Sequence, residues 1–239
     1  MIEISCRHNQ IAVLLDPEKL SGRSIPYWAE KINEAKPDYV FLGGSTFSGD
    51  IDPIASHLKQ HTHIPIVLFP GNNKQLTRHA DGLLLLSLIS SRNADMLIGQ
   101  HVEAAPTIRE YGLQVISTGY ILIDGGRESA TQRVSCSMPI QRDNIQLAVN
   151  TALAAELLGM QAVYLEAGSG ALQPVPQDMI RQVKKTISIP LIVGGGLKNH
   201  NDIHKAIDGG ADLVVIGNHF EQNPDEMADF CDFVHSYNK

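Results

Sequence analysis

Short apolar runs alternate with amphipathic helical segments along the chain, and this alternation is the feature that most constrains the fold. The pattern is typical of a parallel sheet whose strands are joined by helices. Eight runs predict a closed (β/α)8 TIM barrel, and 239 residues is near the usual length of one such barrel. We therefore expect a single α/β domain over residues 1–239, with strands at 11–17, 39–45, 64–71, 82–90, 114–123, 162–168, 190–196 and 213–218.

Two connections depart from the regular alternation. Only about ten residues, 72–81, join the third run to the fourth, which is the lower limit for a helical crossover. We therefore expect a modified barrel in which the third helix is missing or stunted. Residues 124–142 form a polar stretch that contains glycine, and we expect a long loop on the active face or an extra hairpin there.

Composition argues against several classes of function. The formal net charge is −7 and the chain has no lysine or arginine run, so the basic surface that nucleic acids require is not expected. The longest apolar run, residues 82–89, is far shorter than the roughly 20 residues that span a bilayer. The N-terminal sequence MIEISCRHNQ lacks a signal-peptide core. We therefore expect a cytoplasmic protein with reduced thiols at Cys6, Cys136 and Cys231.

Glycine-rich turns follow the last two expected strands. The seventh run ends in Gly194, Gly195 and Gly196, and the eighth ends in Gly217 and Asn218. The phosphate site of such barrels usually lies after strands seven and eight, and glycine lets an anion approach backbone N–H groups at a helix N-terminus. The two turns together predict a site for a phosphate monoester. The alternative is that the glycines only permit tight turns and close helix packing.

Alternate residues of a strand share a face, and this parity directs polar side chains into the barrel. If the aliphatic neighbours of Tyr164 and Glu166 pack under the helices, both polar side chains point inward near the mouth. Glu166 is then a candidate general base for a substrate hydroxyl. Asp16 and Ser45 also point inward, and their oxygens suit a magnesium ion that keeps some waters and binds a diphosphate. The structural alternatives are a turn cap at Asp16 and a partner for a buried donor at Glu166.

Two histidine pairs have the spacing of neighbours on one helix face. They are His57 with His61 and His200 with His204. Both pairs fall in expected outer helices rather than at strand ends, and neither has a suitably placed third ligand. We therefore expect no metal site at either pair.

Eight motifs, taken together, resemble the geranylgeranylglyceryl phosphate synthase family. In chain order they are VLLDPEK, FLGGST, LFPGN, LLSLISSRN, STGYILI, YLEAGSGA, IVGGGLKN and VIGN, and they span essentially the whole chain. The motif YLEAGSGA followed by the two glycine turns is the most specific combination. A sister group that prefers longer prenyl chains carries a lysine where this chain has Leu14, and a shorter YLEYSG-like motif. The resemblance therefore favours the geranylgeranyl branch.

The resemblance implies a magnesium-dependent prenyl transfer. The 3-hydroxyl of sn-glycerol 1-phosphate would attack C1 of geranylgeranyl diphosphate, and the first ether bond of a membrane lipid would form as diphosphate leaves. Glu166 would hold or deprotonate the hydroxyl, with Tyr164 as the second catalytic residue, and Asp16 and Ser45 would bind Mg²⁺. The glycerol phosphate would be bound by Tyr164, Leu165, Glu166, Ala167, Gly168, Ser169, Gly170, Gly195, Gly196, Gly217 and Asn218.

Further expectations concern the diphosphate, the prenyl tail and the assembly. Lys19, Lys74 and Arg92 are candidates to help the diphosphate leave. The twenty-carbon tail needs an apolar groove, which a shortened third helix would leave open. The resemblance suggests a homodimer or a hexamer, and the substrate implies transient contact with a membrane surface. The candidates for closing the groove are Trp28, Phe69 and Tyr120.

Two other functions stay open on the residues alone. The glycine turns also suit a barrel enzyme that binds a flavin phosphate or a sugar phosphate, or a barrel that binds a phosphate ester without catalysis. A sensor without catalysis has no need for a base and a magnesium site, so Asp16, Ser45 and Glu166 argue against the second alternative.

Overall fold

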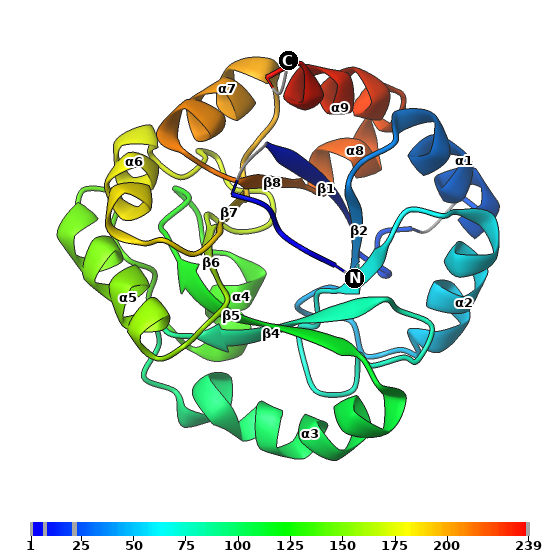
Figure 1. The fold of residues 1–239 in the computed structure, drawn as a ribbon, viewed down its shortest axis with the longest axis horizontal. Helices are drawn as coiled ribbons and strands as arrows, with labels where there is room; N and C mark the ends of the chain where they lie inside the picture. The colour runs from blue at the N-terminus through cyan, green and yellow to red at the C-terminus, as the bar shows by residue number, and fades with distance from the viewer. Residues whose placement is uncertain (1, 7–8, 21–22, 238–239) are drawn as a thin grey trace.

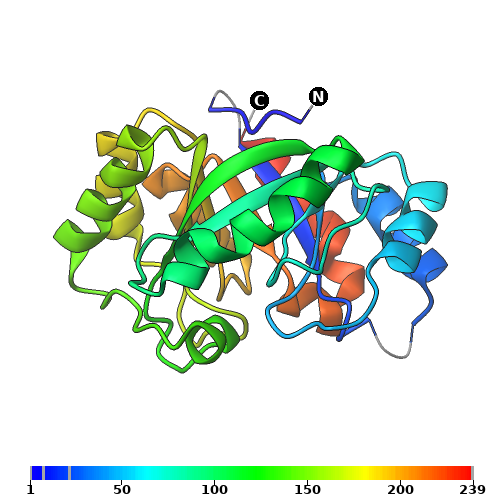
Figure 2. The same cartoon turned by 90° about the horizontal axis from the view of Figure 1, so that it is seen from below.

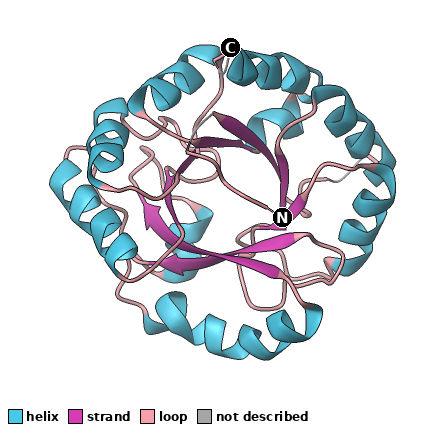
Figure 3. Cartoon of the chain, viewed as in Figure 1, coloured by secondary structure: helices cyan, strands magenta, loops and turns pink. Residues whose placement is uncertain are grey.

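The computed structural model describes residues 2–6, 9–20 and 23–237, and it contains a closed barrel of eight parallel strands surrounded by helices (Figure 1, Figure 3). The strands pair in chain order, and β1 closes the barrel by pairing with β8. This arrangement confirms the predicted fold class. The strands are β1 (Gln10–Leu15), β2 (Tyr39–Leu42), β3 (Ile66–Leu68), β4 (Gly82–Leu88), β5 (Gln114–Leu122), β6 (Ala162–Glu166), β7 (Leu191–Gly194) and β8 (Leu213–Ile216).

Polar caps set the ends of several outer helices. Ser24 accepts a hydrogen bond from the Tyr27 N–H at the start of α1, and Asn199 does the same for Asp202 at the start of α7. Gly210 ends α7 in the left-handed conformation. No helix in the described part of the chain is long and apolar enough to cross a membrane. The helices are α1 (Ile25–Ala35), α2 (Asp52–His61), α3 (Gln100–Tyr111), α4 (Ala130–Ser135), α5 (Ile145–Leu157), α6 (Gln177–Thr186), α7 (His200–Gly209), α8 (Asn218–Gln222) and α9 (Met227–Ser236), with a π-helical turn η1 (Asp95–Gly99) and a 3₁₀ turn η2 (Pro224–Glu226).

Two apolar layers follow the parity of the strands. Val163 and Leu165 of β6 pack between the barrel and the outer helices. Tyr164 and Phe41 belong to a separate cluster inside the barrel, and both are buried. The inward direction predicted for Tyr164 is therefore confirmed. Glu166 lies two residues further along β6 and faces the same interior, close to the mouth.

No helix lies between β3 and β4 in the described residues 69–81, as the short crossover predicts. Figure 1 shows only loop segments in the outer ring between α2 and α3. The buried side chain of Gln75 supports this connection. Its Oε1 accepts hydrogen bonds from the Gly44 and Gly71 N–H groups, and its Nε2 donates to the carbonyl oxygens of Gly44 and Phe47. One amide thus satisfies backbone groups that have no helix to pair them.

Residues 124–142 contain the short helix α4 rather than a hairpin. Ser129 caps this helix by accepting a hydrogen bond from the Gln132 N–H. An isolated bridge between Ile123 and Ile140 closes the base of the 124–142 segment, which we call the excursion. The sequence places the excursion correctly on the active face, but the local cap that starts α4 was not recognised.

The N-terminal segment closes the opposite end of the barrel. Ile2 and Ile4 are buried against the inner cluster, and the Ile2 backbone exchanges hydrogen bonds with the Gln114 side chain at the start of β5. In Figure 2 this blue segment lies at the top, whereas the green helix α4 lies at the bottom. The barrel is therefore open to solvent chiefly on the α4 side.

Candidate active site

A cavity of about 560 Å³ opens at the carboxyl ends of the strands, where the turns after β1, β2, β6, β7 and β8 meet α4. This is the face on which such barrels place their reactive groups. Most of the predicted site residues line this one cavity, although they come from distant parts of the chain. They are Asp16, Ser45, Tyr164, Glu166, Gly168, Ser169, Gly170, Gly195, Gly196, Gly217 and Asn218.

Two predicted residues of the YLEAGSGA motif do not face the cavity. Leu165 and Ala167 are buried in the outer apolar layer, on the opposite face of β6 from Glu166. The Ala167 N–H is already used, because it donates to the Gly194 carbonyl oxygen. These two side chains pack in the layer between the barrel and the helices and do not contact the cavity.

Glu166 occupies the inner wall of the cavity and is buried. Its Oε1 accepts a hydrogen bond of 2.6 Å from the Gly168 N–H. Burial disfavours the charged carboxylate and raises the pKa of Glu166 to about 7, while the bond from Gly168 opposes this rise. Near neutral pH this carboxyl therefore exchanges a proton readily.

Tyr164 and Tyr120 surround this carboxyl with aromatic rings. Their ring centroids are 5.2 Å apart, and burial, together with the charge of Glu166, raises the pKa of both hydroxyls well above the usual value. Among the described residues, the Tyr164 hydroxyl has no partner that meets hydrogen-bond geometry. Both phenols therefore stay protonated, and Tyr164 keeps a donor beside Glu166.

The turns after β6 and β7 require glycine for two different reasons, backbone conformation and close approach. Gly168, Gly170, Gly195 and Gly196 have positive φ angles that other residues rarely adopt. A methyl group on Gly195 would lie 2.3 Å from Glu166 Oε1, so this glycine lets the β7 turn approach the β6 turn. Backbone atoms of both turns therefore border the cavity.

The expected helix N-termini are only partly where the sequence suggested. The turn after β8 leads directly into α8 at Asn218, which is a helix of five residues. The turn after β7 is followed by α7 only at His200, four positions beyond Gly196. Gly194 also has a packing role, because a methyl group there would lie 2.1 Å from the Tyr164 hydroxyl. Gly194 is therefore explained by this close contact with Tyr164 inside the barrel, and not by helix packing.

Basic residues line the cavity mouth, and they are not all the ones that the sequence analysis expected there. Of the three expected helpers, Lys19 lines the cavity, whereas Lys74 and Arg92 do not. Arg127 and Arg133, on the excursion that carries α4, line it instead. Their position in a polar loop on the active face was the available signal, and it was not used for either residue.

The histidine pairs lie away from the cavity. His57 and His61 each place Nδ1 on the backbone carbonyl oxygen four residues earlier. His200 lies 3.0 Å from Asp229 and stacks on Phe233. These contacts account for the pairs as parts of outer helices.

Comparison with known proteins identifies the family. The model of the PcrB family matches residues 4–234. The chain belongs to the PcrB family. A relative from Zunongwangia profunda, geranylgeranylglyceryl phosphate synthase, is 51% identical over 88% of this chain and 90% of its own length. The protein of the same name from Korarchaeum cryptofilum is 40% identical over 91% of this chain and 90% of its own length. The family resemblance seen in the sequence is confirmed.

A solved structure of a PcrB-family relative agrees with the fold. The (S)-3-O-geranylgeranylglyceryl phosphate synthase of Thermoplasma acidophilum, in complex with its substrate sn-glycerol-1-phosphate, superposes with a TM-score of 0.89 at 28% identity. The match covers 96% of this chain and 94% of that one. The barrel of this PcrB-family chain is therefore shared over nearly its whole length.

The metal ligands predicted for this PcrB-family chain lie on neighbouring turns. A methyl group on Gly44 would lie 2.5 Å from Asp16 Oδ1, so the carboxylate rests beside the backbone that leads into Ser45. Ser45 Oγ lies 3.2 Å from Thr131 Oγ1 of α4. The described residues contain no group of three or more His, Cys, Asp or Glu side chains that could hold a metal. Two hard oxygen donors fit a magnesium ion that takes its other ligands from water and a diphosphate.

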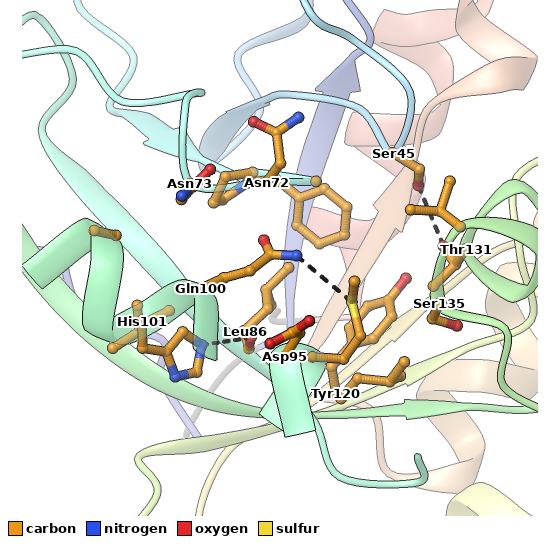
Figure 4. Close-up of a pocket in the computed structure, with 18 of the residues that line it drawn as sticks. Ser45, Asn72, Asn73, Leu86, Asp95, Gln100, His101, Tyr120, Thr131 and Ser135 are labelled. Atoms are coloured by element: carbon orange, nitrogen blue, oxygen red, sulfur yellow. Dashed lines mark hydrogen bonds between the residues drawn. The ribbon is translucent and has the colours of Figure 1, made fainter. Parts of the chain in front are cut away.

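A second, apolar groove adjoins the cavity in this PcrB-family barrel. Ser45, Phe69, Tyr120 and Thr131 border both spaces. Figure 4 shows the groove between the 69–76 connection, β4 and the start of α3, with the Ser45–Thr131 contact at one end and His101 at the other. The side chain of Trp28 is buried in the outer layer and lines neither space. Of the three residues expected to close the groove, only Phe69 and Tyr120 border it.

Proposed function

We propose that the chain joins the 3-hydroxyl of sn-glycerol 1-phosphate to C1 of geranylgeranyl diphosphate and releases diphosphate. One observation carries this proposal: a buried carboxyl, Glu166, lies in a cavity that has glycine turns on one side and Asp16 with Ser45 on the other, and an apolar groove continues from it. The glycine turns suit a phosphate ester, Asp16 with Ser45 suits a diphosphate, and the groove suits a long apolar chain. The reaction needs these three environments next to one another. The names of the relatives support the same reaction.

Glu166 is the proposed base for the attacking hydroxyl. A general base works best when its pKa is near the working pH, and the pKa of Glu166 is raised to about 7. Gly168 holds one carboxylate oxygen through its N–H, so the other oxygen can accept the hydroxyl proton. The Tyr164 hydroxyl lies beside this carboxyl and would orient the same substrate oxygen.

The glycerol phosphate would be bound by the turns at 168–170, 195–196 and 217–218. Backbone N–H groups of glycine turns can approach an anion closely. Arg127 adds a positive charge, because its guanidinium lies near Gly170: a methyl group at that glycine would be 3.6 Å from Arg127 Nη1. These groups would fix the phosphate and direct the 3-hydroxyl towards Glu166.

The diphosphate would bind on the Asp16 and Ser45 side of the cavity. Mg²⁺, when bound there, neutralises the negative charge that develops on the departing diphosphate. Asp16 and Ser45 supply oxygen ligands, and Arg133 on α4 adds positive charge at the same mouth. The role of the protein at this end is to hold the leaving group in line with the hydroxyl.

The prenyl tail would enter the apolar groove. The groove has a volume of about 100 Å³, which is much less than the 560 Å³ of the cavity beside it. It therefore holds the first carbons of the chain, and the remainder extends along the outside of α3. Ile98 of η1 and Val102 of α3 are exposed on this side and provide apolar surface.

The cell location and the assembly are part of the same proposal. A twenty-carbon chain is driven out of water by the hydrophobic effect, so we expect a cytoplasmic enzyme that touches a membrane surface transiently. A homodimer or a hexamer remains a prediction.

A mass-spectrometric assay tests the reaction. The purified protein is incubated with magnesium and geranylgeranyl diphosphate, with sn-glycerol 1-phosphate in one tube and sn-glycerol 3-phosphate in another. We expect a prenylglyceryl phosphate from the 1-isomer alone. If neither isomer gives product across several prenyl lengths, the chain is not this enzyme.

A further inference from the structure

Lys19 joins three turns of the active-site mouth through one ammonium group. The turns follow β1, β6 and β8, and α8 continues from the last of them. Four oxygen atoms surround Lys19 Nζ: Asn218 Oδ1 at 2.8 Å, Ser169 Oγ at 3.1 Å, Asp16 Oδ2 at 3.2 Å and Glu221 Oε2 at 3.6 Å. Lys19 therefore links the metal side of the cavity to the phosphate side.

The contacts of Lys19 are all with oxygen atoms of the protein. A lysine ammonium has three N–H groups and accepts no hydrogen bond. Lys19 donates hydrogen bonds to Ser169 and Asn218 and forms ion pairs with Asp16 and Glu221, so its ammonium is directed at protein oxygens. Lys19 acts on the phosphate site through its neighbours.

Asn218 is the neighbour whose orientation Lys19 decides. Because the ammonium only donates, the Asn218 amide must turn its oxygen towards Lys19. Ser169 reinforces this orientation, because its hydroxyl accepts from Lys19 and donates to the same Asn218 oxygen at 2.9 Å. The Asn218 NH₂ group then faces away from Lys19 towards Gly170, where a methyl group would lie 3.4 Å from Nδ2.

This orientation places two new N–H donors over the turn at 168–170. It also means that the Ser169 hydroxyl has no proton to give to a phosphate, since that proton is already bonded to Asn218. Asp16 and Glu221 hold the ammonium from the other side. Within the Lys19 network the donor that faces the phosphate turn is thus the amide of Asn218, beside the separate charge of Arg127.

We propose that Lys19 is a positioning residue that fixes the Asn218 amide so that its NH₂ group donates to the bound phosphate. The identity of the phosphate ester rests on the proposed function, but the geometry applies to any phosphate in this turn. A lysine three residues after the metal aspartate would therefore control phosphate affinity without touching the phosphate.

Calorimetric titration with inorganic phosphate and with sn-glycerol 1-phosphate, both without metal and prenyl diphosphate, tests this role. The proteins are the wild type, Lys19→Met, Asn218→Ala and the double variant. Lys31→Met is the matched control, because Lys31 also bridges two carboxylates, Glu34 and Asp225, but lies outside the cavity. Thermal unfolding checks each fold, and Lys19→Ala replaces Lys19→Met if the latter does not fold.

We expect Lys19→Met to weaken binding of both anions about tenfold, as loss of one well-placed hydrogen bond predicts. In the Asn218→Ala background, Lys19→Met should lower the affinity for either anion by less than about twofold, because the two residues act as a unit. Lys19→Arg should recover part of the affinity, and Lys31→Met should bind like the wild type. In turnover, the KM for glycerol phosphate should rise in Lys19→Met as it does in Asn218→Ala.

Other outcomes would overturn this role. An equal loss in both backgrounds would mean that Lys19 contacts the phosphate directly, and no loss in either would remove it from the site. A wild type that binds neither anion would overturn the phosphate site and this inference together. A wild type that binds phosphate but forms no prenyl product would overturn the proposed reaction alone, and the comparison of variants would still decide the role of Lys19.

Discussion

At the scale of single residues, strand parity predicts which way a side chain points within a strand. It no longer applies to residues past the end of the strand. Tyr164 and Glu166 lie within β6 and point as predicted. Ser45 lies three residues past the end of β2, and its neighbour Gly43 has a φ of 151°. Its place beside Asp16 comes from the turn, which a period of two does not describe. Parity therefore gives a physical reason for the inward direction of Glu166, and a weaker one for the placement of Asp16 and Ser45.

The network around Lys19 could not be predicted from the sequence. Its hydrogen-bond partners Ser169 and Asn218 are 150 and 199 positions away. No local pattern reports a contact over that distance. The motif that follows β1 marked Lys19 only as a charge near the mouth.

The raised pKa of Glu166 predicts opposite pH dependences for activity and stability. The base needs the carboxylate form, so kcat should rise as the pH passes about 7. The folded protein holds the proton more tightly than the unfolded chain does, so the stabilising effect is complete below the unfolded pKa of 4.5 and is lost as the pH rises through about 7.

Glu166→Gln tests both dependences. The variant should lose turnover by about 10² or more, bind glycerol phosphate normally, and become more stable than the wild type at pH 8 by up to about 3 kcal/mol. A pH–rate profile and denaturant unfolding at pH 5 and pH 8 measure these effects. Wild-type turnover in the variant would remove Glu166 from the mechanism.

Asp16→Asn should abolish the magnesium-dependent turnover. The amide keeps the shape of the side chain but loses the negative charge that a hard cation prefers. Rates measured across a magnesium titration give the result. Unchanged magnesium dependence would place the metal elsewhere.

At the scale of elements, the short crossover between β3 and β4 was the most informative irregularity in the sequence. Ten or so residues cannot easily hold a helix and two turns, and the structure has none in residues 69–81. The excursion at 124–142 was harder to predict, because α4 is a helix of six residues with only one clear cap. Short helices carry too few periods to be recognised.

The groove beside this crossover predicts a change in substrate length. Ala104 is buried on α3 and lines the groove, whereas its neighbour Ala105 is exposed outside it. Ala104→Phe should fill the groove and move the preference towards shorter prenyl diphosphates by about tenfold in kcat/KM, the effect of losing one or two buried CH₂ groups.

Thr107→Phe is the matched control, because it adds the same ring on the same helix at a position that borders neither the groove nor the exposed surface around Ile98 and Val102. Competition between C10, C15 and C20 diphosphates in one tube gives the ratio directly. An identical preference in both variants would mean that the tail does not pass this part of α3.

At the scale of the whole molecule, the eight runs predicted the barrel because each strand is a local feature and closure follows from their number and order. The segment that closes the far end was not predicted. Ile2 and Ile4 are too few for a periodic pattern, and their burial depends on the completed barrel. The polar link between Ile2 and Gln114 also joins parts of the chain that only the closed fold brings together.

Ile2→Ala should destabilise the barrel and leave catalysis alone. The loss of a buried aliphatic side chain costs about 2–4 kcal/mol, and this end lies opposite the active-site mouth (Figure 2). Unfolding in urea gives the free energy, and the KM values for both substrates serve as the control. A change in either KM would show that the two ends of the barrel are coupled.

The interrupted ring of helices has a consequence for how the product departs. A barrel with a complete outer ring exchanges its contents only through the mouth. Here the apolar groove beside α3 adjoins the polar cavity and would give the site a second opening. A product with a polar head and an apolar chain would then leave without reorienting. Its head already lies towards water, and its chain already lies towards the apolar surface.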